Sequence, residues 1–256
     1  MSAAAQRWRG AVVPIALVAL AETAAWATDL QSDNLARPSE IILAFAEAMV
    51  DGLVLKATAQ TLAAALGGLA IGAMLGLLCG LMLGLFRTAS RLMMVSVEVF
   101  RPIPSVALIP IGMLVFGFGY RFEISIVAFA TFWPMLILTR AAIAGIDPRL
   151  IEMSRVVGLG PLARIWKIAL PASLPRMFVA LRLSAGIALI VAVTVEIAAN
   201  PLGLGYAMMV AQQTLHPDLT FALLVWVGLV GWGFNALLLL AQRHLFGRAG
   251  LAEARY

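Results

Sequence analysis

The chain has 256 residues, of which 62% are hydrophobic and 12% charged. A soluble domain is only about 45–50% apolar, so this composition argues against a soluble enzyme and predicts an all-α membrane protein. The net charge of +5 comes from basic residues spread over short segments, which offer no groove to a nucleic acid, and the single Cys79 allows neither an intrachain disulfide nor a thiolate metal cluster.

Six stretches are long and apolar enough to cross a bilayer, because a spanning helix needs about 20 mostly apolar residues. The first of them, with Arg7 and Arg9 before it, also fits a cleavable signal peptide, but Glu22 interrupts its apolar run and favours a retained helix. We therefore predict one transmembrane domain over residues 1–256, with spans at about 11–28, 57–84, 92–118, 124–144, 177–198 and 219–241.

The basic residues give the predicted orientation, because Lys and Arg accumulate in the cytoplasmic loops of membrane proteins. With the N-terminus inside, only Arg37, Lys56 and Arg121 fall on the external side. Six crossings then place both termini in the cytoplasm. The residues on the cytoplasmic side are Arg7, Arg9, Arg87, Arg91, Arg140, Arg149, Arg155, Arg164, Lys167, Arg176, Arg182, Arg243, Arg248 and Arg255.

Residues 38–52 lie between the first two predicted spans. Pro38 can begin a helix, and Ile41, Phe45 and Met49 follow at helical spacing. This pattern predicts an external amphipathic helix that lies on the membrane surface.

The second span carries a glycine at every fourth position. Residues at this spacing share one face of a helix, so a second helix can approach the missing side chains closely. Packing within the chain, a seam between two copies and a glycine-lined conduit all fit this face. The glycines are Gly68, Gly72, Gly76, Gly80 and Gly84.

Prolines and charged residues open the third span. Pro102 and Pro104 remove backbone donors and predict a bend, and Arg101 lies about ten residues inside the span. An unpaired arginine at this depth costs at least ~2.5–3.5 kcal/mol, so Arg101 needs a partner or water. It either pairs with Glu98 or faces the translocation pathway. Candidate pathway residues are Glu98, Arg101, Pro104 and Glu196, although Glu196 is equally compatible with a bond between helices.

A basic, amphipathic segment follows the fourth span. Asp147 is a good N-cap, Pro148 a good first helical residue, and Gly158 suits a left-handed stop, so residues 148–157 are predicted as a short helix. A second helix should begin at Pro161 and stop at 170–171. Periodicity alone would also allow an ordinary interfacial loop.

This segment resembles the EAA loop of permease subunits of binding-protein-dependent ABC importers. Glu152-Met153-Ser154 stands where Glu-Ala-Ala is usual, Gly158 follows at the family spacing, and the segment closes with Ile168-x-Leu170-Pro171. Further stretches are similar to the nitrate, sulfonate, taurine and bicarbonate class of these permeases. They are 36–39, 100–104, 107–110, 116–117, 174–182 and 203–206.

The resemblance implies a type I ABC importer permease fold with cytoplasmic coupling helices between spans 4 and 5, in a loop over 145–175. It also implies a second permease copy in a homodimer, two cytoplasmic ATP-binding subunits, a periplasmic or lipid-anchored solute-binding protein, and a bacterial inner membrane. The solute would be a small oxyanion such as a sulfonate, nitrate or bicarbonate. Residues implied to couple to the ATPase are Arg149, Glu152, Met153, Ser154, Arg155, Gly158, Leu170 and Pro171.

Catalysis is not expected of this chain. It contains no Gly-x4-Gly-Lys-Ser/Thr loop, so ATP hydrolysis belongs to a partner, and no cofactor or metal is expected. His216 and His244 lie far apart without a metalloprotease motif. The alternative is a secondary transporter or channel that works without ATPase partners, but such proteins usually repeat their broken helices, and here only the third span is broken.

Overall fold

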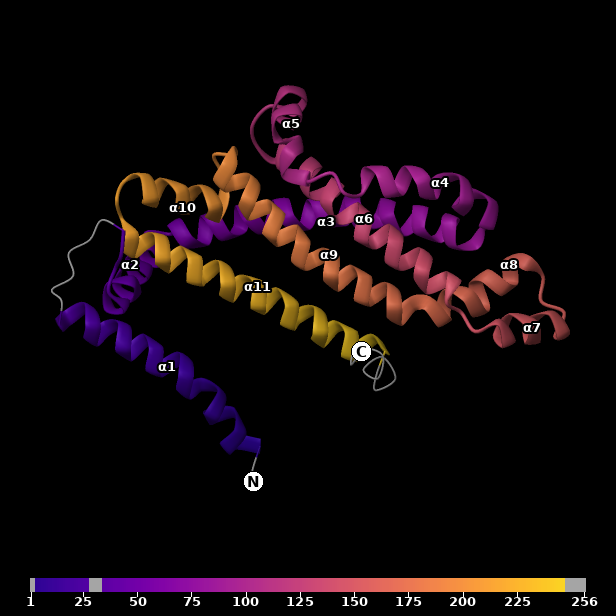
Figure 1. Ribbon diagram of the computed structural model, residues 1–256, viewed down its shortest axis with the longest axis horizontal. Helices are drawn as coiled ribbons and strands as arrows, with labels where there is room; N and C mark the ends of the chain where they lie inside the picture. Colours follow the sequence, from indigo (N-terminus) through magenta and orange to yellow (C-terminus); the bar gives the residue numbers. More distant parts are fainter. Residues whose placement is uncertain (1–2, 28–33, 247–256) are drawn as a thin grey trace.

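A computed structural model describes residues 3–27 and 34–246 of the chain, and within these residues all regular structure is helical (Figure 1). The predicted all-α class is therefore confirmed. The α-helices are α1 (Ala3–Ala27), α2 (Pro38–Val50), α3 (Leu53–Leu85), α4 (Arg87–Phe100), α5 (Ile109–Phe116), α6 (Tyr120–Ala144), α7 (Pro148–Val156), α8 (Pro161–Arg164), α9 (Leu170–Ala198), α10 (Gly203–Gln213) and α11 (Pro217–Phe246).

Four described stretches are long and apolar enough to cross a membrane, and a fifth is added if one bent pair of helices counts as a single span. The four are α3, α6, the continuous stretch Leu162–Gln213 that contains α9, and Pro217–His244 in α11. The apolar part of α1, Val12–Ala27, is shorter than these. The predicted count of six spans therefore stays a prediction.

The glycine face of α3 packs against α6, and this is the most extensive contact between helices in the described chain. A Cβ atom added at Gly76 would lie 2.5 Å from the backbone oxygen of Phe132, and one at Gly80 would lie 2.6 Å from that of Leu136. Gly68, Gly72 and Gly84 meet α6 in the same way. The two helices approach so closely because no side chain separates them.

The third predicted span is broken. Residues Arg87–Phe100 and Ser105–Phe116 are joined at an angle of 79° around the prolines, as their missing backbone donors predict. In Figure 1, α4 runs beside α3 and α6, whereas α5 projects from the bundle. The predicted span 92–118 thus consists of two helical segments, and the predicted bend between them is confirmed.

The second helix of the basic segment does not stop at Leu170 and Pro171, contrary to the prediction. α8 passes through a π-helical turn, Ile165–Ala169, directly into α9. The N–H of Leu170 donates to the carbonyl of Ile165, five residues back. Pro171 then occupies the first turn of α9, where a helix does not need its missing N–H.

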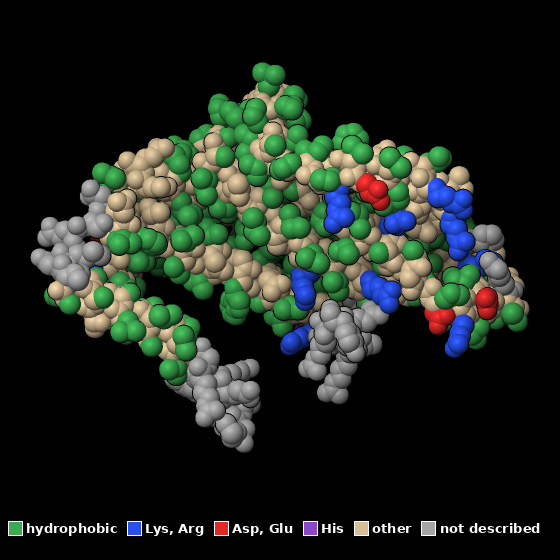
Figure 2. Space-filling model, in the orientation of Figure 1, with side chains coloured by type: hydrophobic (Ala, Val, Ile, Leu, Met, Phe, Trp, Pro, Cys, Tyr) green, Lys and Arg blue, Asp and Glu red, His purple; other side chains and the backbone are tan. Residues whose placement is uncertain are grey.

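The basic side chains gather at one end of the molecule. Figure 2 shows Lys and Arg over the half that carries α7, α8 and the turn between α3 and α4, whereas the half with α2 and α10 shows almost none on this face. We call these the basic end and the opposite end. Of the residues used to predict orientation, Arg248 and Arg255, with the side chains of Arg7 and Arg9, lie outside the described residues.

Candidate functional site

The EAA-like segment forms a short helix followed by a tight turn at the basic end. Asp147 accepts the backbone N–H of Arg149 through Oδ1 at 2.9 Å, and α7 then runs from Pro148 to Val156. The backbone of Gly158 has φ +76°, so the left-handed stop predicted there is confirmed. Glycine adopts this conformation without the steric penalty of about 1–2 kcal/mol that a Cβ brings.

The residues of α7 divide into one buried position and several exposed ones. Ser154 is buried, and its hydroxyl donates to the carbonyl of Ile151 at 2.5 Å. Arg149 and Glu152 are exposed, and Met153 has 65% of its surface open. The side chain of the remaining predicted coupling residue, Arg155, lies outside the described part.

Large apolar side chains are exposed around this turn. Met153, Val156 and Val157 stand on and just after α7, and the next helical segment adds Leu162 and Trp166. Val156 is 89% exposed and Leu162 is 70% exposed. We call these five residues the loop patch. An apolar group rimmed by exposed charges, here Arg149, Glu152 and Lys167, is typical of a protein docking surface.

The π-helical turn attaches this loop to α9 without a flexible linker. The turn packs against α7 on one side and continues into α9 on the other. Leu170, a predicted coupling residue, is half-buried against the cluster formed by Ala142, Ile143 and Met177, and Pro171 is exposed. The π-helical turn thus forms a packed connection between α7 and α9.

Arg101 lines a cavity of about 290 Å³ between the broken third span and α6 and α9. Ser105 and Trp133 line it as well, and the buried indole N–H of Trp133 has no acceptor among the described residues. No ion pair or hydrogen bond joins Arg101 to Glu98 within the described chain, although both side chains are exposed. The geometry thus leaves the guanidinium of Arg101 free to meet a solute or water. Neither Glu98 nor Pro104 lines this cavity.

Glu196 belongs to a separate, fully buried polar cluster. Its Oε2 accepts the backbone N–H of Gly205 at 2.8 Å. Asn200 donates through Nδ2 to Oε2 of Glu123 at 2.6 Å, and its Oδ1 accepts the backbone N–H of Gly119 at 2.8 Å. The side chains of Glu123 and Asn200 are 0% exposed and that of Glu196 is 1% exposed, so none of them faces the Arg101 cavity.

The same cluster caps the first turn of α10. The N–H of Gly203 donates to Gln60 and that of Leu204 to Thr61, at 3.0 and 2.9 Å, so both caps come from α3. A Cβ at Gly203 would overlap the Glu196 carboxyl group. These bonds fix the short helix α10 onto α3 and α9, because the first N–H groups of a helix need acceptors from outside it.

The sequence did not single out Gln60, Thr61, Glu123 and Asn200. They lie near the ends of three apolar stretches, and the separation of these stretches in the sequence hides the proximity of the residues in space. One local pattern did indicate a turn here, because Asn200-Pro201 precedes the glycine-containing sequence Gly203-Leu204-Gly205.

Comparison with known proteins places these features in a family. Residues 53–250 match the family of binding-protein-dependent transport system inner membrane components. The chain is 34% identical over 219 residues to the aliphatic sulfonates transport permease protein SsuC of Escherichia coli (strain K12), covering 86% of this chain and 83% of that protein. It is 29% identical over 237 residues to SsuC of Bacillus subtilis (strain 168), covering 93% of this chain and 86% of that protein.

The fold agrees. A chain in the crystal structure of an amino acid ABC transporter with histidines aligns with a TM-score of 0.66 and 18% identity, covering 78% of this chain and 97% of that chain. The family match covers α3 to α11, including the EAA-like loop. The protein is therefore a member of the binding-protein-dependent transport system inner membrane components, the transmembrane permease subunits of ABC importers.

Proposed function

We propose that α7 and the turn after it couple this permease to a cytoplasmic ATP-binding subunit. The observation that carries the proposal is the loop patch, which exposes Met153, Val156, Val157, Leu162 and Trp166 at the basic end. Exposed apolar side chains can face lipid. Here they share a short loop with exposed charged side chains, and a groove on a partner protein can contact both kinds of side chain better than lipid can.

The structure supports a lever mechanism for this coupling. When two ATP-binding subunits close on ATP, each moves the α7 of the permease copy docked on it. The π-helical turn carries that motion into α9, and Ile187 and Val191 of α9 line the cavity that holds Arg101. Movement of the loop would thus change the shape of the pathway. Glu152 orients α7 within the groove, and Gly158 sets the direction in which α7 leaves the turn.

The Arg101 cavity supports an oxyanion as the solute. A guanidinium offers forked donors that match sulfonate, nitrate or bicarbonate oxygens, and Ser105 and the N–H of Trp133 add further donors. The two SsuC relatives are named for aliphatic sulfonates, which favours a sulfonate among these oxyanions. Pro104 contributes the bend that precedes Ser105, and Glu98 adds an exposed charge one turn before Arg101, so both act on the pathway from outside the cavity lining.

Assembly follows from the same arrangement. One chain carries one coupling loop, and ATP-binding subunits act in pairs, so we propose a homodimer of permeases with two ATP-binding subunits and a periplasmic or lipid-anchored binding protein. The gathering of Lys and Arg at the basic end supports a cytoplasmic position for that end and for both termini.

A polar substitution in the loop patch tests the docking role. Val156 and Val50 are matched, since they are the same residue type and are 89% and 88% exposed, at the basic and the opposite end respectively. We expect Val156→Asn to weaken association with the ATP-binding subunit by about tenfold, as lost burial of one valine predicts. The first readout is the affinity of the purified permease in nanodiscs for the ATP-binding subunit. The second is the stimulation of ATPase activity by the solute-loaded binding protein.

Val50→Asn is the control and should leave both readouts unchanged. Equal loss in the two variants would mean that the polar substitution harms the fold generally. Wild-type association in Val156→Asn would remove the loop patch from the docking surface.

A further inference from the structure

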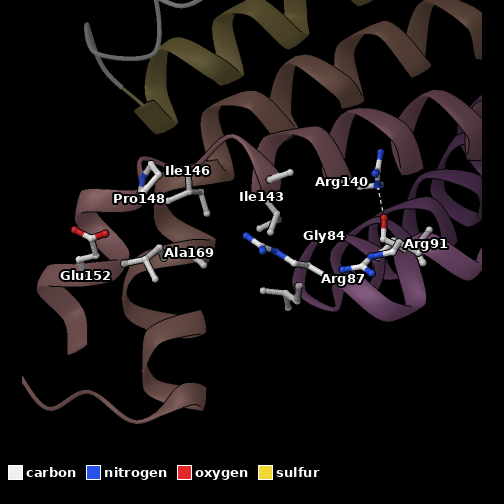
Figure 3. A pocket seen from close by; sticks show the side chains of 14 residues that line it. Gly84, Arg87, Arg91, Arg140, Ile143, Ile146, Pro148, Glu152 and Ala169 are labelled. Atoms are coloured by element: carbon white, nitrogen blue, oxygen red, sulfur yellow. Dashed lines mark hydrogen bonds between the residues drawn. The ribbon is translucent and has the colours of Figure 1, made fainter. Parts of the chain in front are cut away.

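A cavity of about 560 Å³ lies at the basic end, between the start of α4 and α7, and its mostly apolar lining carries several charged side chains. Arg87, Ser90 and Arg91 of α4 line one side together with Arg140 from the last turns of α6, and Glu152 of α7 lines the other. Figure 3 shows Arg87 extending from α4 across the space toward α7, with Arg91 and Arg140 on the α4 side. The cavity is distinct from the Arg101 cavity, with which it shares no lining residue.

The lining carries more positive than negative charge. Three guanidinium groups face one carboxylate, that of Glu152, and no ion pair joins Glu152 to any of them among the described residues. Arg140 donates through Nε to the hydroxyl of Ser90 at 2.8 Å, which fixes its orientation. Within the described chain, Arg87 and Arg91 make no side-chain hydrogen bond.

Helix ends of both signs surround the cavity. Arg87 is the first residue of α4, and the N-cap Phe86 provides no side-chain acceptor for the first-turn N–H groups, so the positive end of this helix dipole lies beside the arginines. The last turns of α3 and α6 also line the cavity and bring the negative ends of their dipoles. The net positive charge of the lining therefore comes from the three guanidinium groups, which exceed the single carboxylate of Glu152, and an anion between them would offset it.

We propose that this cavity is a binding site for a phosphate-like or sulfate-like oxyanion. Forked guanidinium donors match the oxygens of such groups, and the cavity has room for them. The group could be supplied by an anionic lipid headgroup or by a free anion from the cytoplasm, and the chemistry of recognition is the same for both.

Occupancy of the site would act on α7 through charge, because the Glu152 carboxylate stands on the far wall and a bound anion repels it. A bound anion would then compete with Glu152 for the arginines and favour displacement of the EAA-like loop away from α4. This regulatory consequence rests on the proposed coupling role of α7, whereas the binding site itself does not.

The first experiment measures binding without transport. The reference chain and every variant carry Arg101→Ala, so that the Arg101 cavity does not contribute to sulfate binding. The purified full-length chain is placed in phosphatidylcholine nanodiscs and titrated with sodium sulfate in a chloride background of constant ionic strength. We expect the double variant Arg87→Ala/Arg91→Ala to weaken sulfate binding about tenfold or more, since each arginine offers charge-assisted hydrogen bonds. Arg243→Ala removes an exposed arginine at the end of α11 that is outside the cavity lining, and should bind sulfate as the reference chain does.

A second arm tests the lipid source. Nanodiscs with phosphatidylglycerol are compared with phosphatidylcholine alone, and native mass spectrometry counts the phosphatidylglycerol molecules retained by each variant. Retention lost in the double variant but kept in Arg243→Ala assigns the site to a lipid headgroup. Sulfate binding without lipid retention assigns it to a free anion. If the alanine variant fails to fold, Arg87→Lys/Arg91→Lys keeps both charges but removes the forked donors, and should weaken binding by a smaller factor.

Three results would overturn the proposal. In the first, the double variant binds sulfate and retains lipid as the reference chain does. In the second, Arg243→Ala loses as much sulfate binding and lipid retention as the double variant, which would mean that the effect comes from the overall charge of the protein. A double variant that lost only its association with the ATP-binding subunit would show that an acidic protein surface fills the cavity. The coupling proposal is tested separately by Val156→Asn, so either proposal can fail alone.

Discussion

Arg101 is the residue whose environment bears most directly on transport. It lines a cavity beside Trp133, and no described residue neutralises its charge. We expect Arg101→Ala to reduce sulfonate uptake by about tenfold or more, because one charge-assisted contact with the solute is lost. The yield of the assembled complex should stay normal. Uptake of a labelled aliphatic sulfonate into proteoliposomes, measured beside complex yield, checks this.

Arg121 provides the matched control. It is an exposed arginine at the start of α6, outside the Arg101 cavity, so Arg121→Ala should transport normally. Normal uptake in Arg101→Ala would reject the pathway role. A parallel fall in complex yield would instead make Arg101 a structural residue.

Asn200 shows how one buried side chain can hold the end of α9 against the start of α6. It bonds the Glu123 carboxyl group of α6 and the N–H of Gly119, the N-cap of α6, from its own position after α9. Asn200→Leu would remove one hydrogen bond from each of these two groups, at about 1–3 kcal/mol each, so the thermal midpoint in detergent should fall clearly. Asn235→Leu changes an exposed asparagine of α11 and should leave the midpoint unchanged. Equal midpoints for the two variants would contradict this account of the cluster.

At the scale of helices, the contact between α3 and α6 rests on the absence of side chains. A methyl group at Gly76 would meet the backbone of Phe132 at 2.5 Å, and backbone cannot move aside as a flexible side chain can. We expect Gly76→Ala to destabilise the protein by about 1–3 kcal/mol, the usual cost of overpacking. Gly186 of α9 has no atom within 4 Å of its added Cβ, so Gly186→Ala should be tolerated.

Thermal unfolding of the two variants in the same detergent measures this difference. Both substitutions put the same methyl group into a long apolar helix, so their intrinsic effect on helix stability cancels. A midpoint for Gly76→Ala equal to that of Gly186→Ala would mean that α3 and α6 can separate at little cost.

For the whole molecule, the charge distribution predicts which end faces the cytoplasm. Val50 and Val156 are highly exposed at opposite ends, and Cys79 is the only cysteine. In a Cys79→Ser background, Val50→Cys in intact spheroplasts should react with a membrane-impermeant maleimide, whereas Val156→Cys should react only after the membrane is opened. The physical reason is the excess of Lys and Arg at the basic end. Labelling in the reverse order would invert the proposed orientation and remove α7 from the cytoplasm.

Local patterns in the sequence were sufficient to predict the features that depend only on neighbouring residues. Composition predicted the membrane helices, Pro102 and Pro104 predicted the bend, and Asp147, Pro148 and Gly158 predicted the bounds of α7 to within one residue. Caps, prolines and positive-φ glycines act through neighbouring backbone atoms, so they work without a partner helix. The resemblance of the EAA-like loop identified the family for the same reason, because the loop is one uninterrupted segment.

Only the tertiary structure decided what depends on residues far apart in the chain. The sequence left the partner of the glycine face open, and the structure places α6 there. The structure places Glu196 in a buried cluster with Glu123 and Asn200, and not at the Arg101 cavity. Pro171 lies within a continuous helical stretch, because the π-helical turn before it accommodates the proline. Arg87 and Arg91 of α4 met Arg140 of α6 around one cavity. Apart from the π-helical turn, which is a local change of backbone hydrogen bonding, the deciding interaction in each case is a contact between helices, and no spacing within a single helix can specify it.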